Sequence, residues 1–166
     1  MRAMPKVSIR KSRISDIPQI IGIIQKEAET SGALLPVTKE TLAKWIRSGL
    51  SYVAVVDGEV VGHEAAHLWP NCKWVELRSL AVNPDYRGMK IGSTLSLKLL
   101  SEIGKKHDGS TVVAFTNKAG SGKGILKANG FAEVGIEDVP AELFTIGSKH
   151  RGKAEFGYKI VVRKDS

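Results

Sequence analysis

A short segment at residues 80–93 constrains this chain more than any other part of its sequence. It reads LAVNPDYRGMKIGS: an apolar strand ends, a basic loop with glycines follows, and the apolar spacing of a helix begins. Such a loop points several backbone N–H groups at one spot, where the helix dipole adds positive potential. Arg87 and Lys90 add full charges, while Gly88 and Gly92 would let phosphate oxygens approach the backbone. An ordinary strand-to-helix turn is the alternative, but the full string favours a cradle for a pyrophosphate group.

Before this segment, the sequence predicts one strand and two helices. Residues 7–10 alternate apolar with polar side chains and predict a short edge strand. Ser15 then has the features of an N-cap, and apolar residues at helical spacing follow until Gly32. A second helix is predicted from an N-cap at Thr38 to the neighbourhood of Gly49.

A meander of three strands is predicted next, at residues 51–56, 59–69 and 74–82. The dipeptide Asp57-Gly58 between the first two strands is a strong signal for a two-residue hairpin. Because hairpins join neighbouring antiparallel strands, we expect these three strands to lie side by side, with the basic loop leaving from the last of them.

The second half of the chain predicts a crossover followed by further strands. A helix is expected over residues 91–103, ended by Gly104, and a buried strand over residues 111–115. A glycine-rich loop and a short helix then lead to strands at 131–134 and 154–162. Hairpins first and one crossover later predict an α/β fold, a mixed and mostly antiparallel sheet flanked by helices, in the order β-α-α-β-β-β-α-β-α-β-β.

The composition is that of an ordinary globular protein. The 166 residues fit a single domain over residues 1–166, and 42% hydrophobic with 25% charged residues is the usual balance. No run of some 18 apolar residues predicts a membrane span, and the N-terminus lacks the apolar stretch of a secretory signal. The single cysteine, Cys72, fits a reducing compartment, so we expect a cytoplasmic protein. No Cys/His cluster has metal-ligand spacing, so no metal is expected.

The net charge of +8, from 25 Lys+Arg against 17 Asp+Glu, is compatible with an anionic partner. Nucleic acid is not expected, because aromatic residues make up only 6% and do not interleave with the basic ones. The stretch 119–124 resembles a nucleotide-binding P-loop, but the motif needs glycine where Asn117 stands and Ser or Thr where Gly124 stands. We therefore expect neither a nucleic-acid nor a membrane partner, and a monomer or a homodimer.

The segment at 80–93 resembles the acetyl-CoA signature of the GNAT superfamily, Arg/Gln-x-x-Gly-x-Gly/Ala. Arg87 and Gly92 match its ends, whereas Lys90 stands in the place of its middle glycine. Gly130-Phe131 resembles the dipeptide that closes the family's last helix, and the similarity extends over about residues 7–135. The resemblance implies an N-acetyltransferase that uses acetyl-CoA as cosubstrate and acetylates the primary amine of a small molecule. It also implies cofactor contacts from Leu80, Ala81, Val82, Arg87, Gly88, Met89, Lys90, Ile91, Gly92, Ser93 and Asn117.

A narrower resemblance is to the amino-acid N-acetyltransferase branch, which includes N-acetylglutamate synthases. It rests on Leu34-Leu35-Pro36, on DGEVVG at 57–62 and on ELRSLAV at 76–82. The branch has an arginine after Leu-Leu-Pro that helps bind the substrate carboxylate; this chain has Val37 there, a departure that bears on glutamate as the substrate. An amino acid is the acceptor that the resemblance implies, with Leu35 and Arg78 as contacts. A protein N-terminus or lysine side chain as acceptor, and a non-catalytic acyl-CoA sensor, stay open as alternatives.

The reaction that the resemblance implies needs a base for the amine. Glu76 matches the family's catalytic glutamate position, and the alternative is a structural carboxylate paired with Arg78. Glu64 on the neighbouring strand is the second candidate. His63 and His67, which share a face by period two, are expected to be satisfied histidines of the sheet.

The same reaction needs donors for the thioester oxygen and a proton for the leaving thiolate. Backbone N–H groups near residues 80–82 are the expected donors, because this strand splays from its neighbour in the family. The family often uses a tyrosine of the last helix as the acid, and this chain has Leu126 in that place. Thr116 is the expected substitute, with a plain strand-end hydroxyl as the alternative.

Overall fold

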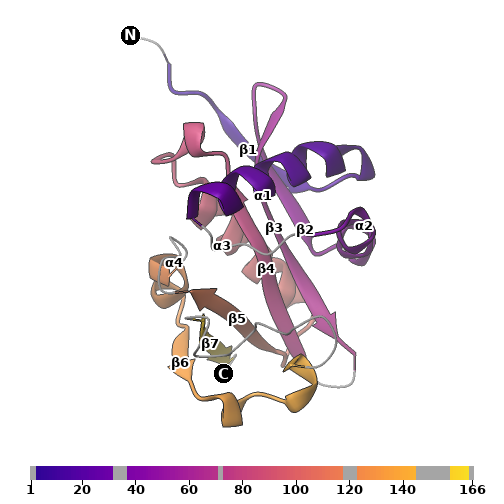
Figure 1. Cartoon of the computed structure of the whole chain (residues 1–166), viewed down its shortest axis with the longest axis vertical. Coiled ribbons are helices and arrows are strands. Elements are labelled where there is room, and N and C mark those ends of the chain that lie inside the picture. The colour runs from indigo at the N-terminus through magenta and orange to yellow at the C-terminus, as the bar shows by residue number, and fades with distance from the viewer. Residues whose placement is uncertain (1–2, 32–36, 71–72, 118–122, 145–157, 165–166) are drawn as a thin grey trace.

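The computed structural model describes residues 3–31, 37–70, 73–117, 123–144 and 158–164. They form one mixed sheet of seven strands in the order β1-β2-β3-β4-β5-β7-β6 (Figure 1). Among the described strands, β4 and β5 pair in parallel and every other neighbouring pair is antiparallel. The α/β class and the order of helices and strands predicted from the sequence are confirmed. The strands are β1 (Val7–Lys11), β2 (Ser51–Val56), β3 (Glu59–Trp69), β4 (Trp74–Val82), β5 (Thr111–Asn117), β6 (Ala132–Val134) and β7 (Tyr158–Lys164).

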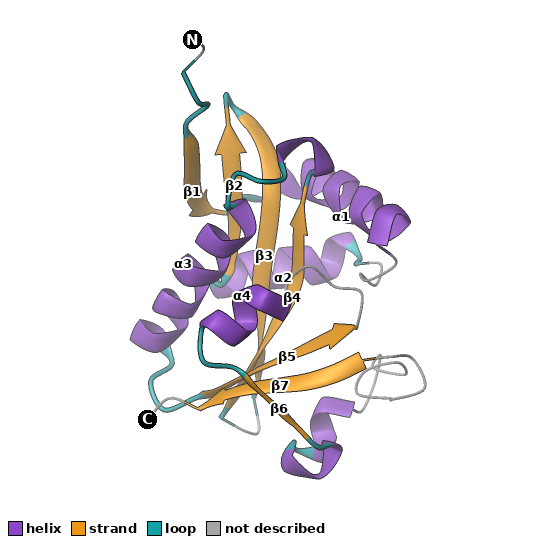
Figure 2. Ribbon diagram, turned by 90° about the vertical axis from the view of Figure 1, so that its left-hand side faces the viewer, coloured by secondary structure: helices purple, strands orange, loops and turns teal. Residues whose placement is uncertain are grey.

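Helices cover both faces of this sheet (Figure 2). The helices α3 and α4 lie on one face, and α1 and α2 lie on the other. None of the described helices is long and apolar enough to span a bilayer. The helices are α1 (Ile17–Ser31), α2 (Lys39–Ser48), α3 (Ile91–Lys106) and α4 (Lys123–Ala128), with 3-10 turns η1 (Ile14–Asp16), η2 (Pro84–Tyr86), η3 (Ile136–Asp138) and η4 (Ala141–Phe144).

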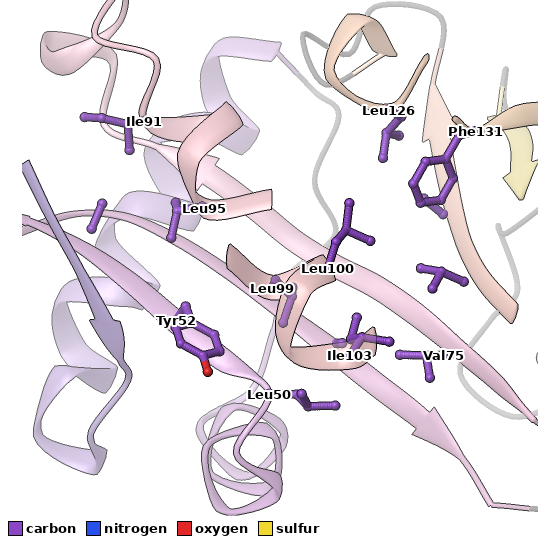
Figure 3. Packing of buried hydrophobic residues seen from close by; sticks show 14 of the residues in the cluster. Leu50, Tyr52, Val75, Ile91, Leu95, Leu99, Leu100, Ile103, Leu126 and Phe131 are labelled. Atoms are coloured by element: carbon purple, nitrogen blue, oxygen red, sulfur yellow. The ribbon is translucent and has the colours of Figure 1, made fainter. Parts of the chain in front are cut away.

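The apolar core is divided between these two faces. On α3, Ile91, Leu95, Leu99 and Ile103 recur every four residues and so share one side of the helix, where all four are buried against the sheet (Figure 3). Burying one such side chain stabilises the fold by about 1.5–3 kcal/mol. A second cluster under α1 and α2 fills the opposite face, and a third joins β5 and β7 to the η4 turn. The second includes Ile20, Ile24, Leu42 and Trp45, and the third includes Val113 and Leu143.

Local signals in the sequence set several of the element ends as predicted. The Thr38 hydroxyl accepts a hydrogen bond from the Thr41 amide at 3.2 Å and caps α2, which ends at Gly49 with φ 78°. Asp57 and Gly58 both have positive φ, 49° and 80°, as a two-residue hairpin with this pair requires.

Two helix ends differ from the prediction. Helix α3 continues past Gly104 to Lys106, because the buried Ile103 holds its last turn on the sheet and its carbonyl accepts from the His107 amide at 2.8 Å. Packing there outweighs the cost of about 1 kcal/mol for a glycine inside a helix. Ser15 lies within the η1 turn instead of capping a helix, since the Asp16 carboxylate accepts from the Arg13 amide.

The last two strands are also shifted from the predicted residues. β6 begins at Ala132, and β7 extends to Lys164, two residues beyond the predicted end. Residues 154–157 of the predicted strand lie outside the described residues.

A carboxylic acid lies inside the α3 side of the core. Glu64 on β3 is 1% exposed, and the Ser96 hydroxyl of α3 donates to its Oε2 at 2.8 Å. Burial raises the pKa of Glu64 from 4.5 to about 8, while the bond from Ser96 acts in the opposite direction and is the weaker effect. Glu64 is therefore neutral at pH 7 in the folded protein, and charged in the unfolded chain.

We expect Glu64→Gln to change how stability depends on pH. Because the folded pKa lies above the unfolded one, the contribution of Glu64 is fully present below pH 4.5 and is lost as the pH rises towards 8. The slope is at most ~1.4 kcal/mol per pH unit. Gln does not titrate, so urea denaturation from pH 5 to pH 8 should show the variant gaining stability relative to the wild type. Parallel curves for the two proteins would contradict a neutral Glu64.

Candidate active site

The candidate site is built around an irregular stretch of β4. Between two β3–β4 pairs, Ala65 with Arg78 and His63 with Ala81, β3 advances two residues and β4 advances three. One extra residue on β4 is a β-bulge, and Ser79 there has φ 57°, a left-handed conformation that is uncommon outside glycine. The bulge reverses the alternation of side chains that follow it.

This reversal decides which face each β4 side chain meets. Before the bulge, Arg78 lies on the α1/α2 face, within 5.7 Å of the Trp45 ring of α2. After it, Leu80 and Val82 pack against the α3 cluster and Ala81 joins the α1/α2 cluster. The bulge thus lets β4 end in apolar contact with α3, directly before the basic loop.

The strands β4 and β5 separate just before the bulge. Their parallel pairing covers residues 74–76 of β4 and 111–113 of β5, and within the described residues it goes no further. Residues 114–117 of β5 pair with β7, while residues 77–82 of β4 have no partner strand on that side in the described part of the chain (Figure 2). An extended ligand arm can pair with the free backbone groups of such an edge. The splayed strand expected from the family resemblance is therefore present.

The backbone amides of the loop after β4 fall into two groups. Those of Asp85, Tyr86 and Arg87 are occupied, by the Asn83 side chain, the Asn83 carbonyl and the Pro84 carbonyl respectively. For the amides of residues 88–93, the described part of the chain supplies no acceptor. These amides precede or open α3, where the helix dipole favours an anion. Only the second half of the predicted loop therefore has amides available for a phosphate.

Lys90 is the N-cap of α3 and adopts the left-handed conformation, with φ 58° and ψ 26°. This is the position where the family signature has its middle glycine, and glycine takes this conformation without steric cost. For a lysine the conformation costs roughly 1–2 kcal/mol. The Lys90 side chain is exposed, and among the described residues it has no ion-pair partner.

The Arg87 side chain turns towards helix α1. Its Nη2 lies 2.8 Å from Glu27 Oε2, and the side chain is 50% exposed. Glu27 is buried in α1, so this pair ties the loop to a helix 60 positions earlier in the chain. This contact was not predicted from the sequence, because nothing local to either residue indicates the other. Arg87 is thereby paired within the protein, whereas Lys90 has no ion-pair partner among the residues that the structure describes.

The two glycines of the loop have different surroundings. Gly88 has φ 81° and open space where a Cβ would stand. A Cβ at Gly92 would lie 3.3 Å from Ile125 Cδ1 of α4 and 3.9 Å from Val82 Cγ2. The absence of a side chain at Gly92 therefore allows α3 to pack closely against α4. At Gly88 there is open space, as was predicted for an approaching ligand. Met89 and Ile91 pack in the α3 cluster, so any contact from them to a ligand involves the backbone.

The face of β4 that carries α1 and α2 holds the second half of the site. Glu76 is 2% exposed and accepts hydrogen bonds from Arg78 Nε at 2.7 Å, Arg78 Nη2 at 3.1 Å and Trp69 Nε1 at 3.2 Å. The Arg78 guanidinium lies over the rings of both Trp45 and Trp69, 5.7 and 5.9 Å from their centroids. His67 Nδ1 accepts from Trp45 Nε1 at 3.4 Å and meets Trp69 edge-on.

This arrangement bears on the two roles considered for Glu76. Both of its oxygens are occupied by the guanidinium and an indole, as expected of the structural pair with Arg78. Two nitrogens of Arg78 bind Glu76, and the third, Nη1, has no hydrogen-bond partner among the described residues. The role of Glu76 as a base stays a prediction. The structure shows an arginine that is bound by a carboxylate and lies over two indole rings. The contacts of Trp45 and Trp69 with Arg78 were not predicted from the sequence.

Thr116 lies on β5 beyond the point of separation from β4. Its hydroxyl is buried and, within the described residues, has no hydrogen-bond partner. Val112 and Ala114 belong to the α3 cluster, so by period two Thr116 faces the same side. A buried hydroxyl without a partner is costly, and a bound ligand would relieve that cost. Leu126 is buried in the same cluster and has no acid–base chemistry to offer.

Some of the predicted residues are beyond what the structure describes. Leu35, Cys72 and most of the glycine-rich stretch, residues 118–122, lie outside the described residues, and of Asn117 only the backbone pairing with Tyr158 is known. Glu64 is separated from the acceptor face, since it is buried on the α3 side of β3. Among the described residues, no three His, Cys, Asp or Glu side chains are grouped to hold a metal ion.

Comparison with known proteins agrees with this geometry. Residues 20–121 match the sequence profile of the Acetyltransferase (GNAT) family. The match covers more than half of the chain, so the chain belongs to this family, as its sequence motif predicted.

Individual relatives extend the comparison. The amino-acid acetyltransferase of Vibrio atlanticus (strain LGP32) is 25% identical over 134 residues, covering 81% of this chain and 28% of that protein. N-acetylglutamate synthase from Neisseria gonorrhoeae, complexed with coenzyme A and N-acetyl-glutamate, superposes with a TM-score of 0.77 at 22% identity, covering 99% of this chain and 36% of that one. Rv2747 from Mycobacterium tuberculosis, in complex with CoA and NLQ, superposes with a TM-score of 0.74 at 25% identity, covering 96% of this chain and 99% of that one. The chain therefore spans well under half the length of the first two relatives.

We expect the Glu76–Arg78 pair to contribute strongly to stability, and Glu76→Ala tests this. Removing one partner of a buried pair leaves an uncompensated charge and costs about 3–5 kcal/mol; the partial exposure of Arg78, 16%, places the loss at or below the lower end. Glu102→Ala is the control, because the lysine partners of Glu102 are exposed and such pairs contribute about 0–1 kcal/mol. Urea denaturation measures both variants, and equal losses would contradict a structural role for Glu76.

Proposed function

We propose that this chain is an acetyl-CoA-dependent N-acetyltransferase whose acceptor is the primary amine of a free amino acid. The observation that carries the proposal is the free edge of β4, residues 77–82, which leads into a loop with available amides at the start of α3. An extended arm pairing with that edge and a diphosphate at the loop are the two features of coenzyme A that this geometry accommodates. Membership of the GNAT family, and relatives solved with coenzyme A, support the same donor.

On this proposal, the diphosphate binds the amides of residues 88–93 and the ammonium group of Lys90. Leu80, Ala81 and Val82 offer backbone groups to the arm. Thr116 and Asn117 of β5 stand on the other side of the separation. The donor then reaches the bulge of β4 with its thioester, close to the face that holds Glu76 and Arg78.

The acceptor side supports an amine that carries a carboxylate. Arg78 Nη1 has no acceptor among the described residues, and its guanidinium is held by Glu76 beside Trp45 and Trp69; guanidinium groups bind carboxylates well. The amino-acid acetyltransferase of Vibrio atlanticus is a relative whose name fits this acceptor class. The amine gives its proton to a base, for which Glu76 stays the candidate, and attacks the thioester carbon; the C–S bond then breaks and the thiolate leaves. A free thiol has a pKa of about 8.5, so proton donation to the thiolate is the least demanding role, and we assign it to Thr116.

A panel of acceptors tests the proposed function. Thiol release from acetyl-CoA is followed with free amino acids, with the same amino acids amidated at the carboxyl group, and with peptides. We expect turnover with free amino acids and a loss of more than about tenfold on amidation, because one charge-assisted hydrogen bond contributes about 1.5–3 kcal/mol. Turnover with peptides alone would indicate a protein N-acetyltransferase. Binding of acetyl-CoA without turnover of any amine would indicate a sensor.

The role of Lys90 gives a separate test of the donor site. We expect Lys90→Gly to keep or raise stability, because glycine takes the left-handed conformation freely. Its affinity for coenzyme A, measured by calorimetry, should fall by about 3- to 10-fold, and the salt dependence of Kd should become shallower, as expected when one cation is lost from an anion site. Lys90→Arg retains the charge and should retain the affinity.

Lys105→Ala is the matched control for net charge, because it removes one cation at the far end of the same helix. Its Kd should equal that of the wild type. If Lys90→Gly bound coenzyme A as tightly as the wild type or more tightly, the amides alone would form the site and the lysine side chain would have no part in it.

A further inference from the structure

A chain of buried polar groups ends at the bulge of β4. His63 of β3 is fully buried, with its Nε2 3.0 Å from Ser51 Oγ of β2 and its Nδ1 3.2 Å from the carbonyl oxygen of Ser79. Ser51 Oγ is in turn hydrogen-bonded to Ser12 Oγ, just after β1, at 2.8 Å. These four residues cross four neighbouring strands, and Ser12 and Ser51 are buried as well.

The protonation of His63 follows from its partners. A carbonyl oxygen can only accept, so Nδ1 carries the hydrogen and donates to Ser79. Burial is the main cause that holds the pKa of His63 down at about 4, so the ring is neutral at pH 7 and has no second hydrogen. Nε2 therefore accepts from the Ser51 hydroxyl. The imidazole is held in one tautomer and one orientation by a partner at each end.

The bond to Ser79 fixes a peptide group as well as a side chain. Ser79 has a positive φ of 57° without being glycine, and a residue in that state persists only where its surroundings hold it. The described peptide bonds are all trans, so the Ser79 carbonyl and the Leu80 N–H point in opposite directions. With the carbonyl directed at His63 of β3, the Leu80 N–H is directed away from His63, and Leu80 lies in the stretch of β4 that pairs with none of the described residues of β5.

We propose that His63 is a positioning residue: through the Ser79–Leu80 peptide it aims the Leu80 N–H at the oxygen of the bound thioester. This inference rests on the proposed function, in which negative charge develops on that oxygen as the amine attacks. A fixed N–H stabilises such charge because no reorientation is needed during the reaction. His63 itself touches neither the donor nor the acceptor.

A first experiment examines the geometry independently of catalysis. Long-range ¹H–¹⁵N NMR spectra of the whole chain with labelled histidines report the tautomer of each ring. We expect His63 to be the Nδ1–H tautomer and to stay neutral from pH 8 to pH 5. In a titration with acetyl-CoA, the amide of Leu80 should shift, and the shift should be reduced in His63→Leu. The Nε2–H tautomer, or an amide shift unchanged in His63→Leu, would overturn the inference.

A second experiment separates positioning from simple core packing. His63→Leu removes the bond to Ser79, whereas His63→Asn keeps a side-chain N–H near the place of Nδ1. We expect kcat of His63→Leu to fall about 10- to 100-fold, as for a misplaced oxyanion donor, with KM for acetyl-CoA changed less than about threefold. His63→Asn should recover most of kcat. Glu64→Gln, a neighbouring buried change on the α3 face, is the control and should retain kcat.

The outcomes distinguish this inference from the proposed function. If the wild type turns over no amine, the proposed function fails, while the tautomer and the Leu80 shift still show whether His63 directs the peptide. If the wild type is active and both His63 variants fold with wild-type kcat, the inference fails and the proposed function stands. Should His63→Leu not fold, His63→Asn and the NMR titration of the wild type decide, since a wild-type protein in which the Leu80 amide does not respond to acetyl-CoA would refute the proposal.

Discussion

The arrangement of this molecule depends on one interruption of hydrogen bonding: β4 and β5 pair over three residues each and then separate. A sheet that opens in this way needs support on both sides of the opening. The α3 cluster supplies it on one face, because Val75, Val112 and Ala114 from the two strands pack under the same helix. On the other side of the opening, β5 is paired along its whole length with β7. The backbone groups left free on β4 are therefore held by a rigid frame, and this makes them usable by a ligand.

The buried polar side chains of β3 and β4 differ in whether they carry a charge. Those without an oppositely charged partner are neutral: burial raises the pKa of Glu64 to about 8 and lowers that of His63 to about 4, so neither side chain is charged at pH 7. Where the site is expected to meet an acceptor, the polar groups are charged and paired, as Glu76 is with Arg78. The cost of burying a charge explains the division, since a carboxylate inside the core without a cation would be far less stable than a protonated acid. A buried carboxylate in this protein thus has a cation beside it, as Glu76 has Arg78 and as Asp16, in the η1 turn, has Arg10.

The sequence predicted the parts of this structure that local rules determine. Periodicity placed the helices and strands, Asp57-Gly58 placed a hairpin, and the order of strand, basic loop and helix placed the loop at the start of α3. It did not predict the bulge at Ser79, because an extra residue in a strand is defined only by the register of its neighbour. It missed the Glu27–Arg87 pair and the tryptophans around Arg78 for a related reason, since these contacts join residues distant in sequence. Gly104 misled the prediction because tertiary packing outweighed a local propensity.

The departure at Lys90 shows how a family pattern and a single structure inform each other. The signature glycine serves a left-handed backbone, and the structure shows that this conformation is kept although the glycine is not. A lysine there carries a conformational cost of roughly 1–2 kcal/mol, which a chain can retain if the side chain contributes elsewhere. Arg87, the other cation of the loop, is already paired with Glu27, and an anion at the start of α3 would otherwise meet amides and a partly offset charge. The left-handed conformation of Lys90 and the pairing of Arg87 with Glu27 are then related. Glu27 neutralises the positive charge of Arg87, and Lys90, three residues later, provides a positive charge at the start of α3.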